Sequence, residues 1–260
     1  MKYIDILSLK ERSESIRNDF QTKQPFHYAM FENFFKQDVA NLIHENYPDI
    51  KDGKWDGTTY VDQKNKFQKH SFDKGSIFYD VFNEMNSAEF LDWLEKFTGI
   101  DQLQGDEELF GGGLHQSIAG AFLNVHVDYN IHPKTKFHRR LNVIVYMNKQ
   151  WHDDYEGHLE LWNLSDKKKE LLAKYSPEFN RCVIFETNEI SFHGHPKPLR
   201  TPEGMNRKSI ATYYYTVDRP DTEIAHAHNT IYVNTEGTTG QVKRMVSAVK
   251  AIWERIVKPK

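Results

Sequence analysis

The sequence predicts a mainly β protein of the sandwich or jelly-roll type, with helices that support it near both ends. Between residues 108 and 217, short apolar runs alternate with turn residues, a pattern typical of short strands and not of repeated βαβ units. Before residue 108 and again near the carboxyl end, apolar residues recur at helical spacing. With 260 residues, the chain is long enough for one domain with a sizeable core.

Composition and charge exclude several classes of protein. The formal net charge of -3 and the pI near 6.5 give no overall attraction to nucleic acid or to an anionic membrane. The single cysteine, Cys182, lies in an apolar run, so a disulfide framework and a cysteine zinc site are both excluded within one chain. No apolar segment approaches the roughly 18 to 20 residues that span a bilayer, and the amino terminus lacks a secretory apolar region. We therefore expect a cytoplasmic protein.

The first hundred residues are expected to form helices, one strand and one long loop. Leu7, Ile16 and Phe20 indicate a surface helix over residues 6–22, followed by a strand over 26–35 and a helix over 37–47. Apolar spacing predicts further helical structure over 77–97, with a break near 86–87 and an end at Gly99. Residues 50–75 are polar and are expected to form a loop, either a substrate-facing lid or a mobile solvated loop.

Strands dominate the expectation for the rest of the chain. They are predicted over residues 114–118, 121–128, 139–147, 159–162, 181–186, 190–193 and 209–216. The insertion 166–175, rich in Lys and Leu, is expected to form a short helix with a solvated charged face. Residues 241–257 predict an amphipathic helix that packs on the sheet or on a second subunit, which would make a homodimer.

Half of a metal site is indicated by Asn124-Val125-His126-Val127-Asp128. In a strand, residues two apart share a face, so the imidazole of His126 and the carboxylate of Asp128 point the same way. The third ligand is expected from Ser191-Phe192-His193-Gly194-His195-Pro196, where His193 and His195 compete. Two His and one carboxylate leave other coordination positions open, as in non-haem Fe(II) oxygenases.

A His-x-Asp tripeptide is not decisive by itself, because about one chance match is expected in such a chain. Residues His152-Asp153-Asp154 also fit the pattern. They lie in a polar, turn-like stretch, whereas His126 and Asp128 lie in an apolar, strand-like run. The sequence context therefore favours His126 and Asp128.

A candidate anion anchor follows fourteen residues after His193, at Arg207. By strand parity, Arg207, Ser209 and Tyr213 share a face. A guanidinium there can grip a carboxylate with both of its arms, and the Ser209 hydroxyl adds a donor. This arrangement would anchor the far end of a dicarboxylate co-substrate.

Six segments in this order resemble the Fe(II)- and 2-oxoglutarate-dependent dioxygenases, within their prolyl-hydroxylase-like branch: His126–Asp128, Arg140–Asn148, Gly157–Trp162, Phe179–Phe185, His193 and Arg207–Tyr215. The resemblance implies a double-stranded β-helix (jelly roll, cupin-like) over residues 108–217. It lies within a single dioxygenase domain, 1–260, in which 1–107 support the core and 218–260 form a carboxyl-terminal extension that carries no motif.

The resemblance also assigns roles to residues. It makes His126, Asp128 and His193 the catalytic iron ligands, and it makes Arg207 the residue that binds the distal carboxylate of 2-oxoglutarate, with Ser209 beside it. Tyr146 matches a tyrosine that helps to bind this co-substrate and Leu159 an apolar residue that packs against it, with plain core packing as the alternative.

Three further residues are substrate candidates. His195 stands where the family pattern has an apolar side chain, so it is expected to face the substrate or to support the metal ligands. Asn142, on the face of Tyr146, and His138 are the other two candidates. His138 ends the loop 129–138, which is either a rim of the substrate site or a solvated basic loop.

The resemblance implies that Fe(II), 2-oxoglutarate and O2 are used to hydroxylate a C–H bond with release of succinate and CO2, with ascorbate as a candidate stimulant. The expected substrate is proline, free or in a peptide; the alternative is another small molecule or a sugar. A non-catalytic jelly-roll binding module and a cupin-like metalloenzyme that does not use 2-oxoglutarate remain as rivals. No nucleic acid or membrane partner is expected.

Overall fold

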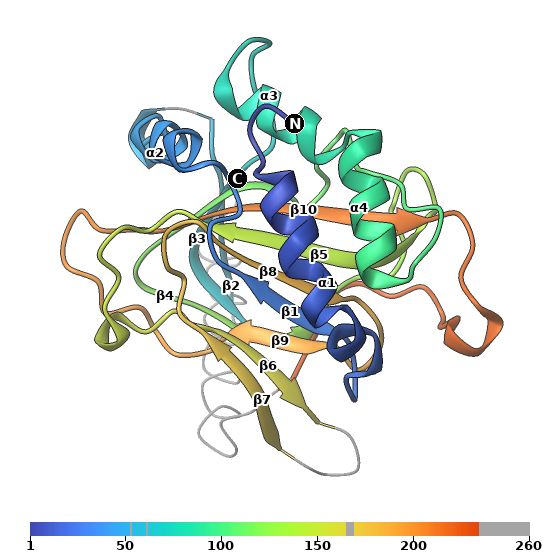
Figure 1. Ribbon diagram of the computed structural model, residues 1–260. Coiled ribbons are helices and arrows are strands. Elements are labelled where there is room, and N and C mark those ends of the chain that lie inside the picture. Colours follow the sequence, from blue (N-terminus) through green and yellow to red (C-terminus); the bar gives the residue numbers. More distant parts are fainter. Residues whose placement is uncertain (53, 61, 165–168, 234–260) are drawn as a thin grey trace.

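The computed structural model describes residues 1–52, 54–60, 62–164 and 169–233 (Figure 1). Its α-helices are α1 (Ile6–Thr22), α2 (Gln37–Glu45), α3 (Ile77–Met85) and α4 (Ala88–Thr98). Its strands are β1 (Tyr28–Phe31), β2 (Asp56–Tyr60), β3 (Gln63–Lys69), β4 (Gly113–Val127), β5 (His138–Tyr146), β6 (Leu159–Asn163), β7 (Glu170–Tyr175), β8 (Arg181–Glu186), β9 (Phe192–His195), β10 (Arg207–Thr216) and β11 (Ile231–Tyr232). Short 3-10 helices lie at Ile50–Asp52, Asp153–Tyr155 and Asp221–Glu223.

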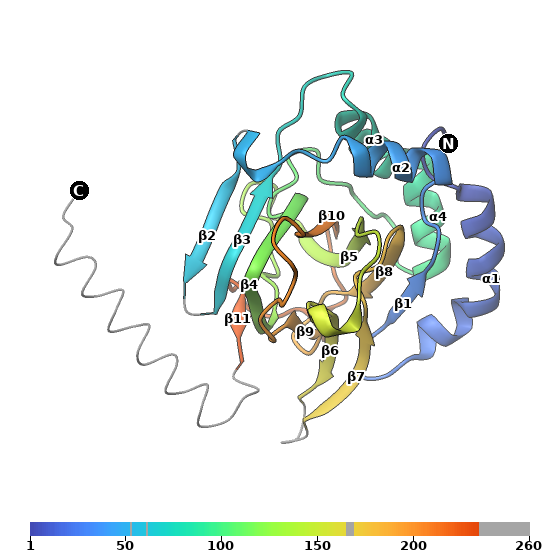
Figure 2. The same ribbon diagram turned by 90° about the vertical axis from the view of Figure 1, so that its left-hand side faces the viewer.

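The long strand β4 closes the sheet into a jelly roll. The strand order is β1-β8-β5-β10-β4-β9-β6-β7, with β3 and β11 also paired to β4. Residues 113–117 of β4 pair with β10, whereas Leu123 and His126 pair with β9. Gly120, with a positive φ of 75°, lies between these parts, and a register irregularity follows between Leu123 and His126; such features bend a strand. The mainly antiparallel sheet therefore curls around an interior (Figure 2), as the fold prediction requires.

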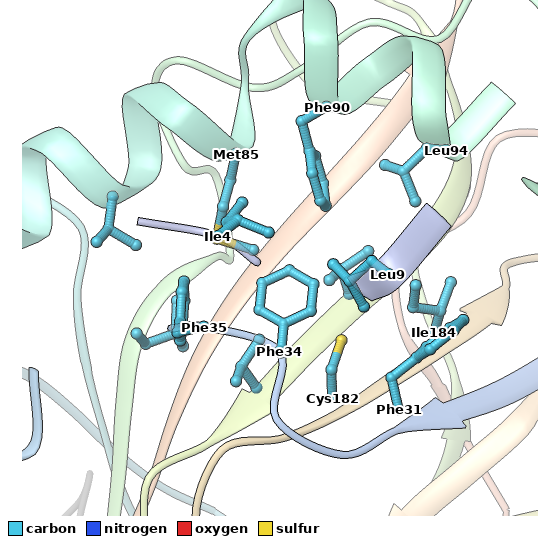
Figure 3. Packing of buried hydrophobic residues seen from close by; sticks show 14 of the residues in the cluster. Ile4, Leu9, Phe31, Phe34, Phe35, Met85, Phe90, Leu94, Cys182 and Ile184 are labelled. Atoms are coloured by element: carbon cyan, nitrogen blue, oxygen red, sulfur yellow. The ribbon is translucent and has the colours of Figure 1, made fainter. Parts of the chain in front are cut away.

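The helices cover the outer face of the curled sheet and form the larger core with it. On β5, Leu141, Val143 and Val145 are fully buried in this core. On β8, Cys182 and Ile184 pack into the same cluster as the helical residues Leu9, Phe90 and Leu94 (Figure 3). The alternate residues of β5 face the inside of the curl. On this inner face the sequence places polar residues.

The prediction of a loop over residues 50–75 is wrong, because β2 and β3 form an antiparallel hairpin there. Strand β3 pairs with β4 from Gln63↔Leu123 to Lys69↔Leu114. At the end of this ladder the backbones approach closely, since a Cβ on Gly113 would lie 2.3 Å from the carbonyl oxygen of Lys69. The hairpin lacks an apolar stripe because its inner face joins the polar interior. A pattern search for alternating apolar residues therefore misses it.

A second correction concerns the insertion 166–175. Its described part, Glu170–Tyr175, is strand β7, which pairs with β6 from Leu159↔Tyr175 to Asn163↔Glu170. The predicted short helix is wrong there, because pairing with an edge strand outweighs a weak helical preference. The helix predicted over residues 241–257, and the dimer through it, lie outside the described residues.

The predicted amino-terminal helices are confirmed, but one of the apolar residues that indicated α1 is exposed. Helix α1 spans the predicted residues, and the break between α3 and α4 falls where it was expected. Leu7, one of the three apolar residues that indicated α1, is 77% exposed, whereas Leu9 is fully buried. Within the described part of the chain, no helix combines the length and the apolar character needed to cross a bilayer.

Because Leu7 and Leu9 lie two residues apart on one helix, they form a matched test of this packing. We predict that Leu9→Ala lowers the free energy of unfolding by about 2–5 kcal/mol, since it leaves a cavity under α1. Leu7→Ala should change it by less than about 0.5 kcal/mol. Urea denaturation followed by circular dichroism measures both values, and equal losses would contradict the placement of α1.

Candidate metal centre and co-substrate pocket

Three ligand side chains meet where β4 runs beside β9. His126 lies directly across from His193 in the register, and Asp128 follows the last residue of β4. His126 Nε2 is 3.5 Å from Asp128 Oδ1, and His193 Nε2 is 3.3 Å from Asp128 Oδ2. The candidate ligand atoms of the three residues lie within 4.8 Å of one another. The structure thus brings together the three residues that the sequence pattern selected.

Both imidazoles are oriented by their own backbone. His126 Nδ1 donates to the carbonyl oxygen of Asn124 at 2.8 Å, and His193 Nδ1 donates to that of Ser191 at 2.9 Å. In each ring the proton therefore sits on Nδ1, and the lone pair of Nε2 points at the carboxylate. Burial lowers the pKa of His126, and His193 lowers it further, so His126 is a neutral donor at physiological pH.

The Asp128 carboxylate is kept ionised by its neighbours on β5. Oδ2 accepts from Arg139 Nη2 at 2.9 Å and from Asn142 Nδ2 at 2.8 Å. Burial by itself raises the pKa of Asp128, but the Arg139 guanidinium together with His193 and His126 outweighs it and holds that pKa well below its usual range. The guanidinium in turn lies over the rings of Tyr213 and Tyr129, at 3.5 and 4.5 Å from their centroids. Arg139 is thus a fixed cation behind the ligand.

This donor set fits Fe(II). Two neutral imidazole nitrogens and one carboxylate form the facial triad of non-haem iron oxygenases and leave positions open for other ligands. Among residues 1–52, 54–60, 62–164 and 169–233, no second group of three His, Cys, Asp or Glu side chains is arranged in this way.

His195 lies apart from the ligand group. It pairs with Leu123 of β4, not with His126. Its Nδ1 has no hydrogen-bond partner among the described residues. Burial lowers the pKa of His195 well below its ordinary value, and the nearby cations Arg207 and Lys66 lower it further. His195 therefore faces the interior as a neutral ring beside those cations.

The alternative His-x-Asp match, His152-Asp153-Asp154, lies in a turn at the surface. Asp153 and Asp154 form a 3-10 turn, and the Asp153 side chain is 87% exposed and accepts from His158 Nε2 at 3.1 Å. Among the described residues, the structure groups His126 and Asp128, but not His152 and Asp154, with a third candidate ligand.

A second polar group surrounds Arg207 on the inner face. Arg207 Nε donates to the carbonyl oxygen of Gly157 at 2.7 Å, and Nη2 lies 3.3 Å from the Tyr146 hydroxyl. Ser209 is the cross-strand partner of Tyr146, and Leu159 packs in the same apolar cluster as that ring. Gly157 must lack a side chain here, because it has a positive φ of 75° and a Cβ would lie 3.1 Å from Arg207 Cδ. Among the residues that the structure describes, the guanidinium has only neutral hydrogen-bond partners, so it can take a carboxylate.

The structure does not bring the other two substrate candidates to an open face of the metal group. The Asn142 amide is occupied, since it donates to Asp128 and its Oδ1 accepts from Arg139 at 2.6 Å. His138 lies among the charges of Arg219, Arg140 and Asp218, which are not part of the metal group.

Three residues near the site were missed by sequence reasoning. Arg139 lies near the start of the strand that carries Tyr146. Its position next to Arg140–Asn148, a segment of the family resemblance, was the one available signal. Tyr232 of β11 pairs with His126 of β4, and the centroids of their rings are 5.3 Å apart. Lys66 lies on β3, where its charge acts on Asp128. Both depend on pairings between distant segments, which no local pattern reveals.

The fold and the site agree with one class of enzyme. Residues 112–215 match the 2OG-Fe(II) oxygenase superfamily. This segment, which carries the candidate metal ligands and Arg207, is thus similar to dioxygenases whose reaction uses Fe(II), 2-oxoglutarate and O2.

A curated relative of the chain is a prolyl 3-hydroxylase. Mouse (Mus musculus) prolyl 3-hydroxylase OGFOD1 is 24% identical over 195 residues, which cover 74% of this chain and 31% of the mouse protein. The chain thus spans about a third of the length of this curated relative.

Solved structures of prolyl hydroxylases share the fold. A Pseudomonas putida prolyl-4-hydroxylase has a TM-score of 0.57 at 15% identity, over 78% of this chain and 98% of that one. A Trichoplax adhaerens prolyl hydroxylase, in complex with a hypoxia inducible factor oxygen degradation domain peptide, has a TM-score of 0.58 at 14% identity, over 81% of this chain and 91% of that one.

The register distinguishes His193 from His195 as the metal ligand, and a pair of variants tests this. We predict that His193→Ala weakens Fe(II) binding by more than the roughly 10- to 100-fold that changes behind the ligands cost. His195→Ala should leave the affinity close to that of the unmodified chain. Anaerobic Fe(II) titration measures both, and the reverse ranking would show that His195 is the ligand.

Arg139 and Arg140 are adjacent arginines with different surroundings. We predict that Arg139→Met lowers Fe(II) affinity by about 10- to 100-fold, because Asp128 loses the cation that fixes it. Arg140 contacts Thr216 and Glu223 instead, so Arg140→Met serves as the control. Equal affinities of the two variants in the same titration would show that Arg139 does not support the ligand.

Proposed function

We propose that this enzyme hydroxylates a C–H bond of proline, free or within a peptide, at the metal group of His126, Asp128 and His193. The observation that carries the proposal is the position of this triad on the same inner face as the Arg207 guanidinium. A dicarboxylate that binds the metal at one end can reach a buried cation with its other end. The similarity to a prolyl 3-hydroxylase supports proline as the substrate.

The side chains of the pocket have distinct tasks in this proposal. Arg207 binds the distal carboxylate of 2-oxoglutarate, and the Tyr146 hydroxyl and Ser209 hydroxyl add neutral donors beside it. Tyr146 and Leu159 belong to an apolar cluster that also includes Phe185 and Val183, and this cluster keeps water away from the co-substrate. Orientation and water exclusion are thus supplied by residues of β5, β6, β8 and β10.

Arg139 and Asn142 keep the ligand carboxylate ionised and fixed, while the Asn124 and Ser191 carbonyls fix the two imidazoles. When bound, Fe(II) with 2-oxoglutarate and O2 supplies the oxidation, in which one oxygen atom enters the substrate C–H bond and the other enters succinate, with loss of CO2. The chain provides positions and charges, and it need not undergo chemical change.

The test is a succinate-release assay with Fe(II), 2-oxoglutarate and ascorbate, across free proline, proline peptides, other amino acids and sugars. We predict that His126→Ala, Asp128→Ala and His193→Ala each abolish iron-dependent succinate formation, because each removes one of three ligands. Arg207→Met should raise the KM for 2-oxoglutarate by about 10- to 100-fold, since it removes a charge-assisted hydrogen bond.

The outcomes separate the rival functions. Full activity of Arg207→Met would indicate a metalloenzyme that does not use 2-oxoglutarate. Absence of succinate from the unmodified, iron-loaded chain would indicate a binding protein. Proline compounds that give no stimulation, while a sugar or another amino acid does, would keep the oxygenase assignment and replace the substrate.

A further inference from the structure

His195 lies between the metal group and Arg207 on the inner face of the sheet. Strand β6 runs antiparallel to β9, with Leu161 opposite His193. His195 is two residues further along β9, and in an antiparallel pair this step leads back along β6 toward Gly157, whose carbonyl oxygen accepts from Arg207 Nε. Two residues advance a strand by about 7 Å, so the ring of His195 stands between the metal ligand and the guanidinium.

Strand β4, on the other side of β9, gives the same order. Along β4 the partner of Arg207 comes first, the partner of His195 second and the partner of His193 last, at positions 117, 123 and 126. Because His193 and His195 are two residues apart on one strand, their side chains share the inner face. A co-substrate that extends from the metal group to Arg207 therefore runs past the ring of His195.

The ring of His195 has a nitrogen whose hydrogen-bonding capacity is unused. The residue is only 5% exposed, and its Nδ1 has no hydrogen-bond partner among the described residues. Burial lowers the pKa of His195 well below its ordinary value and the nearby Arg207 lowers it further, so the neutral ring carries one N–H donor and one acceptor nitrogen. A buried polar atom without a partner destabilises a protein, so such a nitrogen indicates a ligand atom beside it.

Three other histidines of the inner face are held by the backbone. His126 Nδ1 and His193 Nδ1 each donate to a carbonyl oxygen, and His115 Nε2 lies 3.1 Å from the carbonyl oxygen of Gly111. Nδ1 of His195 lacks such a contact within the described part of the chain. Packing by itself therefore does not account for an imidazole at this position.

A carboxylate is the ligand group that matches the ring of His195. In the proposed function, one carboxylate of 2-oxoglutarate is held at the metal and the other at Arg207, and His195 lies between these two points. An N–H donor forms a stronger hydrogen bond with an ionised oxygen than with a neutral one. A contact of this kind would hold the co-substrate between its two ends.

We propose that His195 donates a hydrogen bond to a carboxylate of 2-oxoglutarate and is a third attachment point for the co-substrate, besides the metal and Arg207. This inference rests on the proposed function and deepens it. It also gives a physical reason for a histidine at a position where the family pattern has an apolar side chain.

The experiment separates binding of the metal from binding of the co-substrate, on the full chain and without O2. Titration with Fe(II) gives the affinity for the metal. 2-Oxoglutarate is then added to the Fe(II)-loaded chain, and its affinity is measured from the visible absorption of the Fe(II)–2-oxoglutarate complex. No substrate is added in either step.

The variants differ in what stands in place of the ring. His195→Leu removes both nitrogens and keeps an apolar side chain, and His195→Ala gives a second measurement of the same loss if leucine does not fit. His195→Asn and His195→Gln put an amide nitrogen near the position of Nδ1 and of Nε2, respectively. His44→Leu is the matched control, because His44 contacts the carbonyl oxygen of Met147 and the ring of Phe179 on the helical side of the sheet.

We expect His195→Leu and His195→Ala to weaken 2-oxoglutarate binding by about 10- to 100-fold, because a hydrogen bond to an ionised group is lost. Their Fe(II) affinity should match that of the unmodified chain, since His195 is not a ligand. At least one of the two amide variants should recover most of the loss. His44→Leu should bind Fe(II) and 2-oxoglutarate as the unmodified chain does.

Three results would overturn the proposal. An unchanged affinity of His195→Leu and His195→Ala for 2-oxoglutarate would show that the ring does not contact the co-substrate. An equal loss in all four variants of His195 would show that the shape of the ring matters and its nitrogens do not. A parallel loss of Fe(II) affinity would show that His195 supports the metal ligands.

Failure of the proposed function gives a different result. If the chain does not use 2-oxoglutarate, the absorption of the Fe(II)–2-oxoglutarate complex is missing in the unmodified chain, and the inference falls with the function. If proline alone is the wrong substrate, the binding measurements are unaffected, because they contain no substrate.

Discussion

The ion pair between Asp128 and Arg139 is the constraint on which the rest of the structure depends. A carboxylate removed from water costs several kcal/mol unless a cation and hydrogen bonds compensate it. Arg139 and Asn142 of β5 do so, and they must therefore face the inside of the curled sheet. Leu141 and Val143, the two strand neighbours of Asn142, then face outward, where only a layer of helices can bury them. The polar site and the helical cover are thus two consequences of one strand orientation.

The same division explains which elements the sequence could predict. A continuous apolar side, which packs in the larger core, is present on helices α3 and α4 and on strands β5, β8 and β10. The sequence pattern therefore predicts these elements. The hairpin of β2 and β3 and the edge strand β7 lack such a side, since one faces the polar interior and the other closes an edge. Their existence depends on hydrogen bonds to distant strands, which composition does not record.

Site residues divide in a similar way. His126 and Asp128 are two apart on one strand, so parity alone places them together. Strand parity does not distinguish His193 from His195, because residues two apart lie on the same face of a strand. The register irregularity between Leu123 and His126 distinguishes them: the four residues 123–126 of β4 lie opposite the three residues 193–195 of β9, so His193 faces His126 while His195 faces Leu123. Lys66 and Tyr232 required the same long-range register, and Arg139 required the irregularity in the pairing of β5 with β10, because regular alternation would place it on the face of Leu141.

The inner face is selective for anions as a class before any particular ligand is considered. Among its described charges it presents Arg139 and Arg207 beside the carboxylate of Asp128, and burial lowers the pKa of its histidines His115 and His195 well below the ordinary value. A metal dication adds to this excess, so binding of the metal strengthens the attraction for a dicarboxylate, and the dicarboxylate in return stabilises the metal. Because this coupling acts through charge in a largely buried site, salt screens it little.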